Sequence, residues 1–179
     1  MTIARLALVA AVLLAGCGGG AKPSAPLPAA ATTLKLTSPA FANGGTLPVR
    51  FTCSGKGVSP PLAWSGVPHG ARELALVVED PDAGRFVHWT VLGIAPSSRG
   101  IAEGAVPHGV VQPANSFGDH GWGAACPPKG AGPHRYVFAL YALRAPLGLG
   151  EGASPDGVRS AIAKQAIARG VLTARFGRT

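Results

Sequence analysis

The chain of 179 residues is 47% hydrophobic and 13% charged, which suits one domain with a sizeable core and excludes a second large domain. Its 26 glycines and 17 prolines favour turns and short strands over long helices. The net charge of +8 is spread over single arginines and lysines, with no basic run and no interleaved aromatic residues, so we expect no nucleic-acid partner.

The first 16 residues are typical of a secretory signal peptide. Arg5 precedes an apolar run over 6–14, and small residues follow the run. The run ends in LAGC at 14–17, which resembles the bacterial lipobox, where cleavage leaves the cysteine at the new N-terminus for acylation. We expect removal of residues 1–16 and an exported bacterial lipoprotein, held by lipidated Cys17 on the periplasmic or extracellular face of a cell membrane or outer membrane. An ordinary signal peptide that ends by chance in this sequence is the alternative.

The stretch after Cys17 has no hydrophobic periodicity. It reads GGGAKPSAPLPAAATT and contains few side chains that could anchor a core. This composition predicts a flexible tether over 17–33. The folded domain is expected over 34–179.

Five stretches of the expected domain have the alternation, or the β-branched and aromatic content, of strands. Two of them are apolar on both faces, as central strands of a covered sheet are, and only a short turn separates them. This turn predicts an antiparallel hairpin. The expected strands are 46–53, 73–80, 86–93, 134–143 and 171–177.

One helix is predicted late in the chain. Ser154 is a good N-cap, Pro155 suits the first turn, and Asp156 is favourable at the positive end of the helix dipole. The pattern continues to a stop at Gly170. The sequence therefore predicts a mainly β fold around an antiparallel sheet, with a late C-terminal helix.

The cysteines left after lipidation of Cys17 would form a pair. Cys53 and Cys126 would then lie in a compartment that permits disulfides, and we expect them to bond and to join two long loops. Two free thiols or two metal ligands are the alternatives. Because no Cys-x-x-Cys or His-x-x-x-His spacing occurs, we expect no metal and no cofactor.

The candidate site combines two carboxylates, two histidines and a tyrosine. Asp80 and Asp82 end one apolar strand, His88 lies in the next, and His134 and Tyr136 begin a third. Imidazole N–H and phenol O–H groups are donors for a small anion, and a carboxylate can orient a histidine or accept from an ammonium. Each residue also has a purely structural interpretation, because Asp-Pro-Asp-Ala-Gly is good turn sequence and a buried histidine often bonds a backbone carbonyl.

Three motifs together resemble the phosphatidylethanolamine-binding protein family, and within it the bacterial branch of Raf kinase inhibitor-like proteins. They are FTCSGKGVSPPLAWSGVP at 51–68, DPDAG with the later HW at 80–89, and PPKGAGPHRYVFALYAL at 127–143. The resemblance implies a β-sandwich-like fold around a large antiparallel sheet, with a small pocket for phosphate-type anions and lipid headgroups. It extends from about Leu34 to Arg178.

Carried over by motif, the resemblance assigns the pocket to Asp80, Asp82, His88, His134 and Tyr136. Strand alternation places Arg135 on the opposite face from its neighbours, so we leave it out of the site. Two positions depart from the family pattern, namely Gly84 where a proline is usual, and Trp122 where a tyrosine and a Gly-Pro pair are common.

The expected function is binding. A membrane-tethered protein would capture a phosphate-type anion or phospholipid headgroup in the pocket and could modulate a partner protein. One alternative is a hydrolase that uses the Asp/His cluster, although the sequence has no Gly-x-Ser-x-Gly elbow and no P-loop. The other is a scaffold or inhibitor whose pocket is vestigial.

Overall fold

The larger of two sheets has five strands in the computed structural model, which describes residues 25–31 and 34–179. Its inner strands pair antiparallel, whereas the short edge strand β2 runs parallel to β8. In spatial order the strands are β2 (Gly45–Thr46), β8 (Ala166–Phe176), β7 (His134–Leu143), β4 (Glu73–Asp80) and β5 (Phe86–Ile94).

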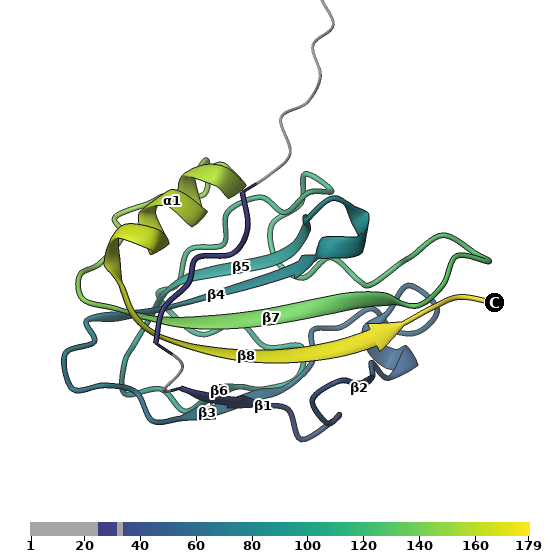
Figure 1. The fold of residues 1–179 in the computed structure, drawn as a ribbon, viewed down its shortest axis with the longest axis horizontal. Coiled ribbons are helices and arrows are strands. Elements are labelled where there is room, and N and C mark those ends of the chain that lie inside the picture. Colours follow the sequence, from purple (N-terminus) through teal and green to yellow (C-terminus); the bar gives the residue numbers. More distant parts are fainter. Residues whose placement is uncertain (1–24, 32–33) are drawn as a thin grey trace, which may run out of the picture.

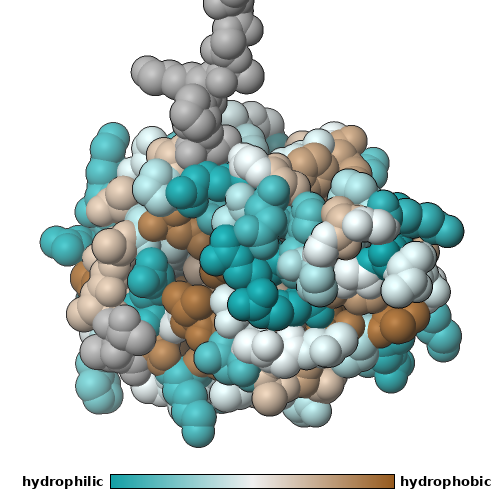
Figure 2. All heavy atoms as spheres, turned by 45° about the vertical axis from the view of Figure 1, so that its right-hand side comes forward, coloured by the Kyte–Doolittle hydropathy of each residue, from teal (hydrophilic) through white to brown (hydrophobic). Residues whose placement is uncertain are grey.

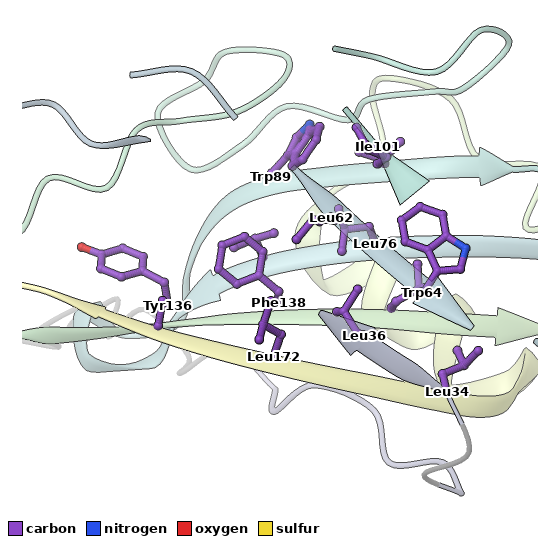
Figure 3. Close-up of a cluster of buried hydrophobic side chains, with 14 of the residues drawn as sticks. Leu34, Leu36, Leu62, Trp64, Leu76, Trp89, Ile101, Tyr136, Phe138 and Leu172 are labelled. Atoms are coloured by element: carbon purple, nitrogen blue, oxygen red, sulfur yellow. The ribbon is translucent and has the colours of Figure 1, made fainter. Parts of the chain in front are cut away.

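A smaller sheet of three strands covers one face of the large sheet (Figure 1). Its strands in spatial order are β1 (Lys35–Thr37), β3 (Leu62–Ser65) and β6 (Gly100–Ile101). The main core fills the space between the sheets, where side chains from both layers interdigitate, as Figure 3 shows for Leu36, Trp64 and Phe138. This arrangement confirms the expected β-sandwich-like fold.

The opposite face of the large sheet is covered by α1 (Pro155–Gln165). Val158 and Ile162 lie one turn apart on the buried side of the helix and pack on Val77 and Tyr141. Because both faces of β4 are covered, all eight of its residues are buried, which explains the continuous apolar run in its sequence. The predicted strands at 73–80 and 134–143 are confirmed at the residues expected.

The strand expected over 46–53 is wrong. Only Gly45–Thr46 pairs with β8, and the chain then forms a 3-10 helix, η1 (Val49–Phe51). Pro48 has no N–H to donate to a sheet, and the helical turn lets Leu47 and Phe51 both reach the core, where each is fully buried. In the sequence Leu47, Val49 and Phe51 alternate like the residues of one strand face, but Val49 is exposed.

The helix ends earlier than the sequence predicts. Its Ser154 N-cap accepts a bond from the Gly157 amide at 3.1 Å as expected, but α1 stops at Gln165 and β8 begins at Ala166. Residues 166–170 pair with the end of β7 instead of continuing the helix. The predicted last strand is therefore correct in place but starts five residues earlier, because pairing with a long neighbouring strand outweighs local helix propensity.

Part of the stretch expected as a tether lies against the domain. The Pro28 carbonyl accepts bonds from the Tyr141 hydroxyl at 3.1 Å and from the Arg169 guanidinium at 2.9 Å, and Leu27 packs near α1. Because of these contacts, the folded domain includes residues that precede Leu34. The expected signal peptide and Cys17 lie outside the described residues. Within 25–31 and 34–179, no helix is long and apolar enough to cross a membrane.

Candidate functional site

A pocket of about 170 Å³ opens where the β4–β5 hairpin, the start of β7 and the loop before β7 meet. This volume is below the roughly 300–1,000 Å³ of pockets for drug-sized ligands, so it suits a small group. Figure 2 turns this end of the molecule forward and shows hydrophobic and hydrophilic residues mixed on its surface. The lining residues are Asp80, Ala83, Phe86, His88, Phe117, Cys126, Pro127, Pro128, His134 and Tyr136.

Asp80 is the buried anchor of the pocket. It ends β4 and caps the following 3-10 helix, η2 (Pro81–Ala83), by accepting bonds from the amides of Asp82 at 2.9 Å and Ala83 at 3.1 Å on Oδ1. Its other oxygen, Oδ2, accepts from His134 Nδ1 at 2.7 Å. The turn chemistry and the site chemistry therefore use different oxygens of one carboxylate.

His134 is oriented by this contact. It begins β7 beside the hairpin, and its Nδ1 is occupied by Asp80. The second ring nitrogen, Nε2, is left for the pocket that the ring lines. A carboxylate on Nδ1 fixes the orientation of the ring.

His88 is held by the backbone of the long loop. It lies on β5, its Nδ1 lies 2.8 Å from the Gly123 carbonyl, and the Gly123 amide donates back to the His88 carbonyl at 2.7 Å. Since a carbonyl oxygen only accepts, Nδ1 carries the proton and Nε2 is the variable nitrogen. Burial lowers the pKa of His88, against the opposing effects of the Gly123 carbonyl and the Asp80 charge.

Tyr136 brings an unused hydroxyl to the pocket. The side chain is fully buried, and its hydroxyl has no hydrogen-bond partner among the described residues. In Figure 3 this hydroxyl points away from the rest of the labelled core cluster. Burial, followed by the charge of Asp80, raises the pKa of the phenol, so the group is a neutral donor at physiological pH. A buried hydroxyl without a partner is costly, and a bound ligand would remove this cost.

The mouth of the pocket is apolar, which the site prediction missed. Phe86 and Phe117 pack edge to face with ring centroids 4.6 Å apart, and Pro127 and Pro128 add a further apolar part of the wall. Phe86 could have been found from sequence, because it precedes His88 by two residues on one strand and so shares its face. Phe117 comes from the long loop, where no periodic pattern places a side chain.

Asp82 does not line the pocket, although the sequence placed it in the site. Its carboxylate faces the guanidinium of Arg135, with the shortest contact 2.7 Å, and also accepts from the Arg135 amide at 2.8 Å. The hydrogen bond from Arg135 lowers the pKa of Asp82 to about 2. Arg135 lies on the outer face of β7, as alternation predicted, and draws Asp82 to that side.

The two departures from the family pattern have clear structural roles. Gly84 ends η2 with φ = +67°, a left-handed conformation that a proline cannot adopt. Trp122 stacks on Phe138 behind the pocket, and its indole N–H donates to the Phe51 carbonyl at 3.2 Å. Neither residue lines the pocket.

A disulfide between Cys53 and Cys126 forms part of the pocket wall. Its Cα atoms are 5.3 Å apart, and Cys126 directly precedes the two wall prolines. The bond joins the loop after η1 to the loop before β7, as the sequence predicted. Cys126 is therefore not a free nucleophile.

The lining chemistry favours binding of a polar group. In the described part of the chain, the lining includes two histidines, one carboxylate and one phenol, but no serine, threonine, lysine or arginine. No group of three or more His, Cys, Asp or Glu side chains suited to a metal ion occurs within 25–31 and 34–179. The arrangement offers imidazole and phenol hydrogen bonds under an aromatic rim.

Comparisons with known proteins agree with the fold. A model of the phosphatidylethanolamine-binding protein family matches residues 37–177. LppC of Mycobacterium tuberculosis, named as a lipoprotein, is 44% identical over 193 aligned residues, which cover 98% of this chain and 94% of LppC. Among solved structures, CT736 of Chlamydia trachomatis, described as a homologue of this family, has a TM-score of 0.77 at 36% identity. Escherichia coli YbcL, described as a member of the mammalian family, has a TM-score of 0.78 at 32% identity. Each match covers 83% of this chain and 100% of the solved chain.

Proposed function

This chain belongs to the phosphatidylethanolamine-binding protein family, and we propose that it is an exported, membrane-tethered protein whose pocket binds a phosphate-type anion, either free or as part of a phospholipid headgroup. The observation that carries the proposal is the buried, unpaired hydroxyl of Tyr136 beside His88 and His134. Each histidine uses Nδ1 within the protein and has Nε2 left for a ligand.

The donors of the pocket suit the oxygens of a phosphate. The Tyr136 hydroxyl can donate one hydrogen bond to the phosphate. The rings of His88 and His134 can each donate one more when Nε2 is protonated, which makes three donors. Asp80 does not repel the ligand as a bare carboxylate would, because two backbone amides and His134 already bond its oxygens. Bonds to an ionised oxygen are stronger than neutral ones, so three donors are sufficient for a small anion.

The rim of the pocket suits the organic part of the ligand. Phe86 and Phe117 stand at the mouth, and half of the Phe117 surface is exposed. A phosphate with a short carbon chain, such as a headgroup, can place its phosphate among the histidines and its carbons against these rings. We propose binding rather than catalysis, because the lining residues include no aliphatic hydroxyl or free thiol to act as a nucleophile.

The proposed membrane tether follows from the N-terminal sequence and from a relative. LAGC at 14–17 resembles a lipobox, and LppC, which matches nearly the whole chain, is named as a lipoprotein. Lipid attached to Cys17 would keep the pocket close to a bilayer, where phospholipid headgroups are concentrated.

An NMR titration of the full chain in detergent with phosphate and with phosphorylethanolamine tests the pocket. We expect saturable shifts of the imidazole signals of His88 and His134, loss of both responses in His88→Ala, and no shift at the exposed His69. If phosphorylethanolamine binds more tightly than phosphate, the ligand is better described as a phospholipid headgroup. Equal affinities would favour a free anion. Folded protein with no response at either ring would contradict the proposed function.

A further inference from the structure

The pocket wall formed by Cys126, Pro127 and Pro128 follows Ala125, whose carbonyl accepts a bond from the Cys53 amide at 3.1 Å. It belongs to the long connection between β6 and β7, which contains no strand of either sheet. Loops of this length keep one conformation only where contacts fix them. One fixing contact is the disulfide from Cys126 to Cys53.

A second fixing contact comes from the C-terminal end of the chain. Arg178 follows β8, and its Nε donates to the Pro127 carbonyl at 2.7 Å. Its Nη1 lies 3.6 Å from Cys53 Sγ, on the other side of the disulfide. The planar guanidinium therefore spans the wall and the cysteine to which the wall is bonded.

The backbone of Arg178 supports the same wall. Its carbonyl accepts from the Gly130 amide at 3.1 Å, and Lys129 and Arg178 form a parallel bridge. Because β8 pairs with β7 along its whole length, these contacts connect the wall to the strand that carries His134 and Tyr136. The distance between the wall and the Tyr136 hydroxyl thus depends on Arg178.

We propose that Arg178 is a positioning residue of the pocket, which acts together with the Cys53–Cys126 disulfide to hold the Pro127–Pro128 wall over the ligand. The proposal rests on the proposed function for its effect on binding. It makes a separate claim about the wall that holds in the unliganded protein. Arg178 itself does not line the pocket.

Hydrogen exchange in the unliganded full chain tests the separate claim. In Arg178→Gln we expect the Gly130 amide to exchange about tenfold faster, because a charge-assisted bond that holds the wall is lost. Amides of β4 and β7 serve as the internal control for folding and should not change. Arg175→Gln is the matched control variant, because Arg175 is exposed and lies three residues earlier. Equal exchange in the two variants would overturn the proposal.

Phosphate affinity tests the effect on the site. We expect binding about five- to tenfold weaker in Arg178→Gln and unchanged binding in Arg175→Gln. Arg178→Lys should still bind phosphate several-fold more weakly than wild type. An ammonium keeps the charge but cannot contact the Pro127 carbonyl and the Cys53 sulfur at the same time. Full rescue by lysine would show an effect of charge alone and would overturn positioning.

A double-mutant cycle tests the joint action with the disulfide. In a folded Cys53→Ser/Cys126→Ser background, Arg178→Gln should accelerate Gly130 exchange by a larger factor than in the disulfide-bonded protein, since one support of the wall is already missing and only the backbone bond from Cys53 to Ala125 remains beside Arg178. Equal factors would overturn the claim that both hold one wall. If the disulfide-free chain does not fold, the comparison of Arg178→Gln, Arg178→Lys and Arg175→Gln decides whether Arg178 positions the wall. If the wild-type chain binds neither phosphate nor phosphorylethanolamine, the proposed function fails while the exchange result still decides the role of Arg178.

Discussion

The fold and the proposed ligand have opposite effects on the pKa of His88. Burial lowers its pKa in the free protein, so the ring is mostly neutral near pH 7 and Nε2 is an acceptor. A bound anion stabilises the imidazolium and raises the same pKa. Binding therefore takes up a proton, and affinity rises as pH falls from the pKa of the complex towards that of the free protein.

We expect the affinity for phosphorylethanolamine to rise by up to about tenfold per pH unit over this range. Comparison of wild type with His88→Gln by isothermal titration calorimetry separates the ring from the ligand's own ionisation, and His69→Gln is the control at an exposed histidine. An identical pH profile in His88→Gln would show that the His88 ring takes no part.

The two buried tyrosines of β7 provide a matched test of the unpaired hydroxyl. The Tyr141 hydroxyl donates to Pro28, whereas the Tyr136 hydroxyl has no partner among the described residues. Tyr136→Phe should leave the free energy of unfolding unchanged or raise it by about 1 kcal/mol, and should weaken ligand binding about fivefold. Tyr141→Phe should lower the free energy of unfolding by about 1 kcal/mol and leave binding unchanged. Urea unfolding and ligand titration measure both, and the reverse pattern would contradict the assignment of Tyr136 to the site.

The helix α1 is held on the large sheet by a buried ion pair as well as by apolar contacts. Arg159 Nη2 donates to Glu79 Oε2 at 2.8 Å and to the Arg85 carbonyl at 3.3 Å, and both charged side chains are about 3% exposed. Glu79 directly precedes Asp80, and Arg85 follows the turn that Asp80 caps. The helix therefore braces the hairpin that carries the pocket carboxylate.

Arg159→Met should lower the free energy of unfolding by about 3–5 kcal/mol, because it leaves the buried Glu79 carboxylate without its closest cation. The double variant Arg159→Met/Glu79→Met should recover much of the loss, since removal of both charges leaves none buried alone. Lys164→Met on the exposed side of α1 is the control and should change stability by less than about 0.5 kcal/mol. Urea unfolding of the three variants checks these values, and a single-variant loss as small as that of the control would refute the bracing role.

The same elements show why local sequence was a reliable guide to some segments and not to others. β4 and β7 were predicted at their observed bounds, because each contains a long apolar run that is buried on both faces of the sheet. The end of α1 was misplaced, because Ala166–Ala168 suits a helix locally but pairs with the end of β7. Cross-strand pairing is a contact between distant residues and leaves no local pattern.

At the scale of the whole molecule, the N-terminal segment determines how far the pocket can lie from a membrane. Leu27 and Pro28 already contact the domain, and eight residue steps lead from Cys17 to the first described residue, 25. A chain of this length spans at most about 29 Å when fully extended. A lipid on Cys17 would therefore hold the domain close to the bilayer surface.

Cys17→Ala should release the protein from the membrane fraction of a bacterium that expresses the full chain, because several acyl chains give stable anchoring and none remain. Fractionation followed by detection of the chain measures this. Cys53→Ser/Cys126→Ser is the control and should stay in the membrane fraction. Equal membrane association of wild type and Cys17→Ala would contradict the proposed lipid anchor.

The amino-acid sequence by itself determined the mainly β class, the central hairpin and the Ser154 N-cap of the helix, and it predicted the pairing of Cys53 with Cys126 on the condition that Cys17 carries lipid. These features follow from local periodicity, capping chemistry and cysteine number, which a linear sequence records. The tertiary structure alone decided that Asp82 turns to Arg135, that Phe117 and the prolines enclose the pocket, and that Arg178 meets their wall. Each of these depends on contacts between residues far apart in the chain, and such contacts exist only after the two sheets and the long loop have packed together.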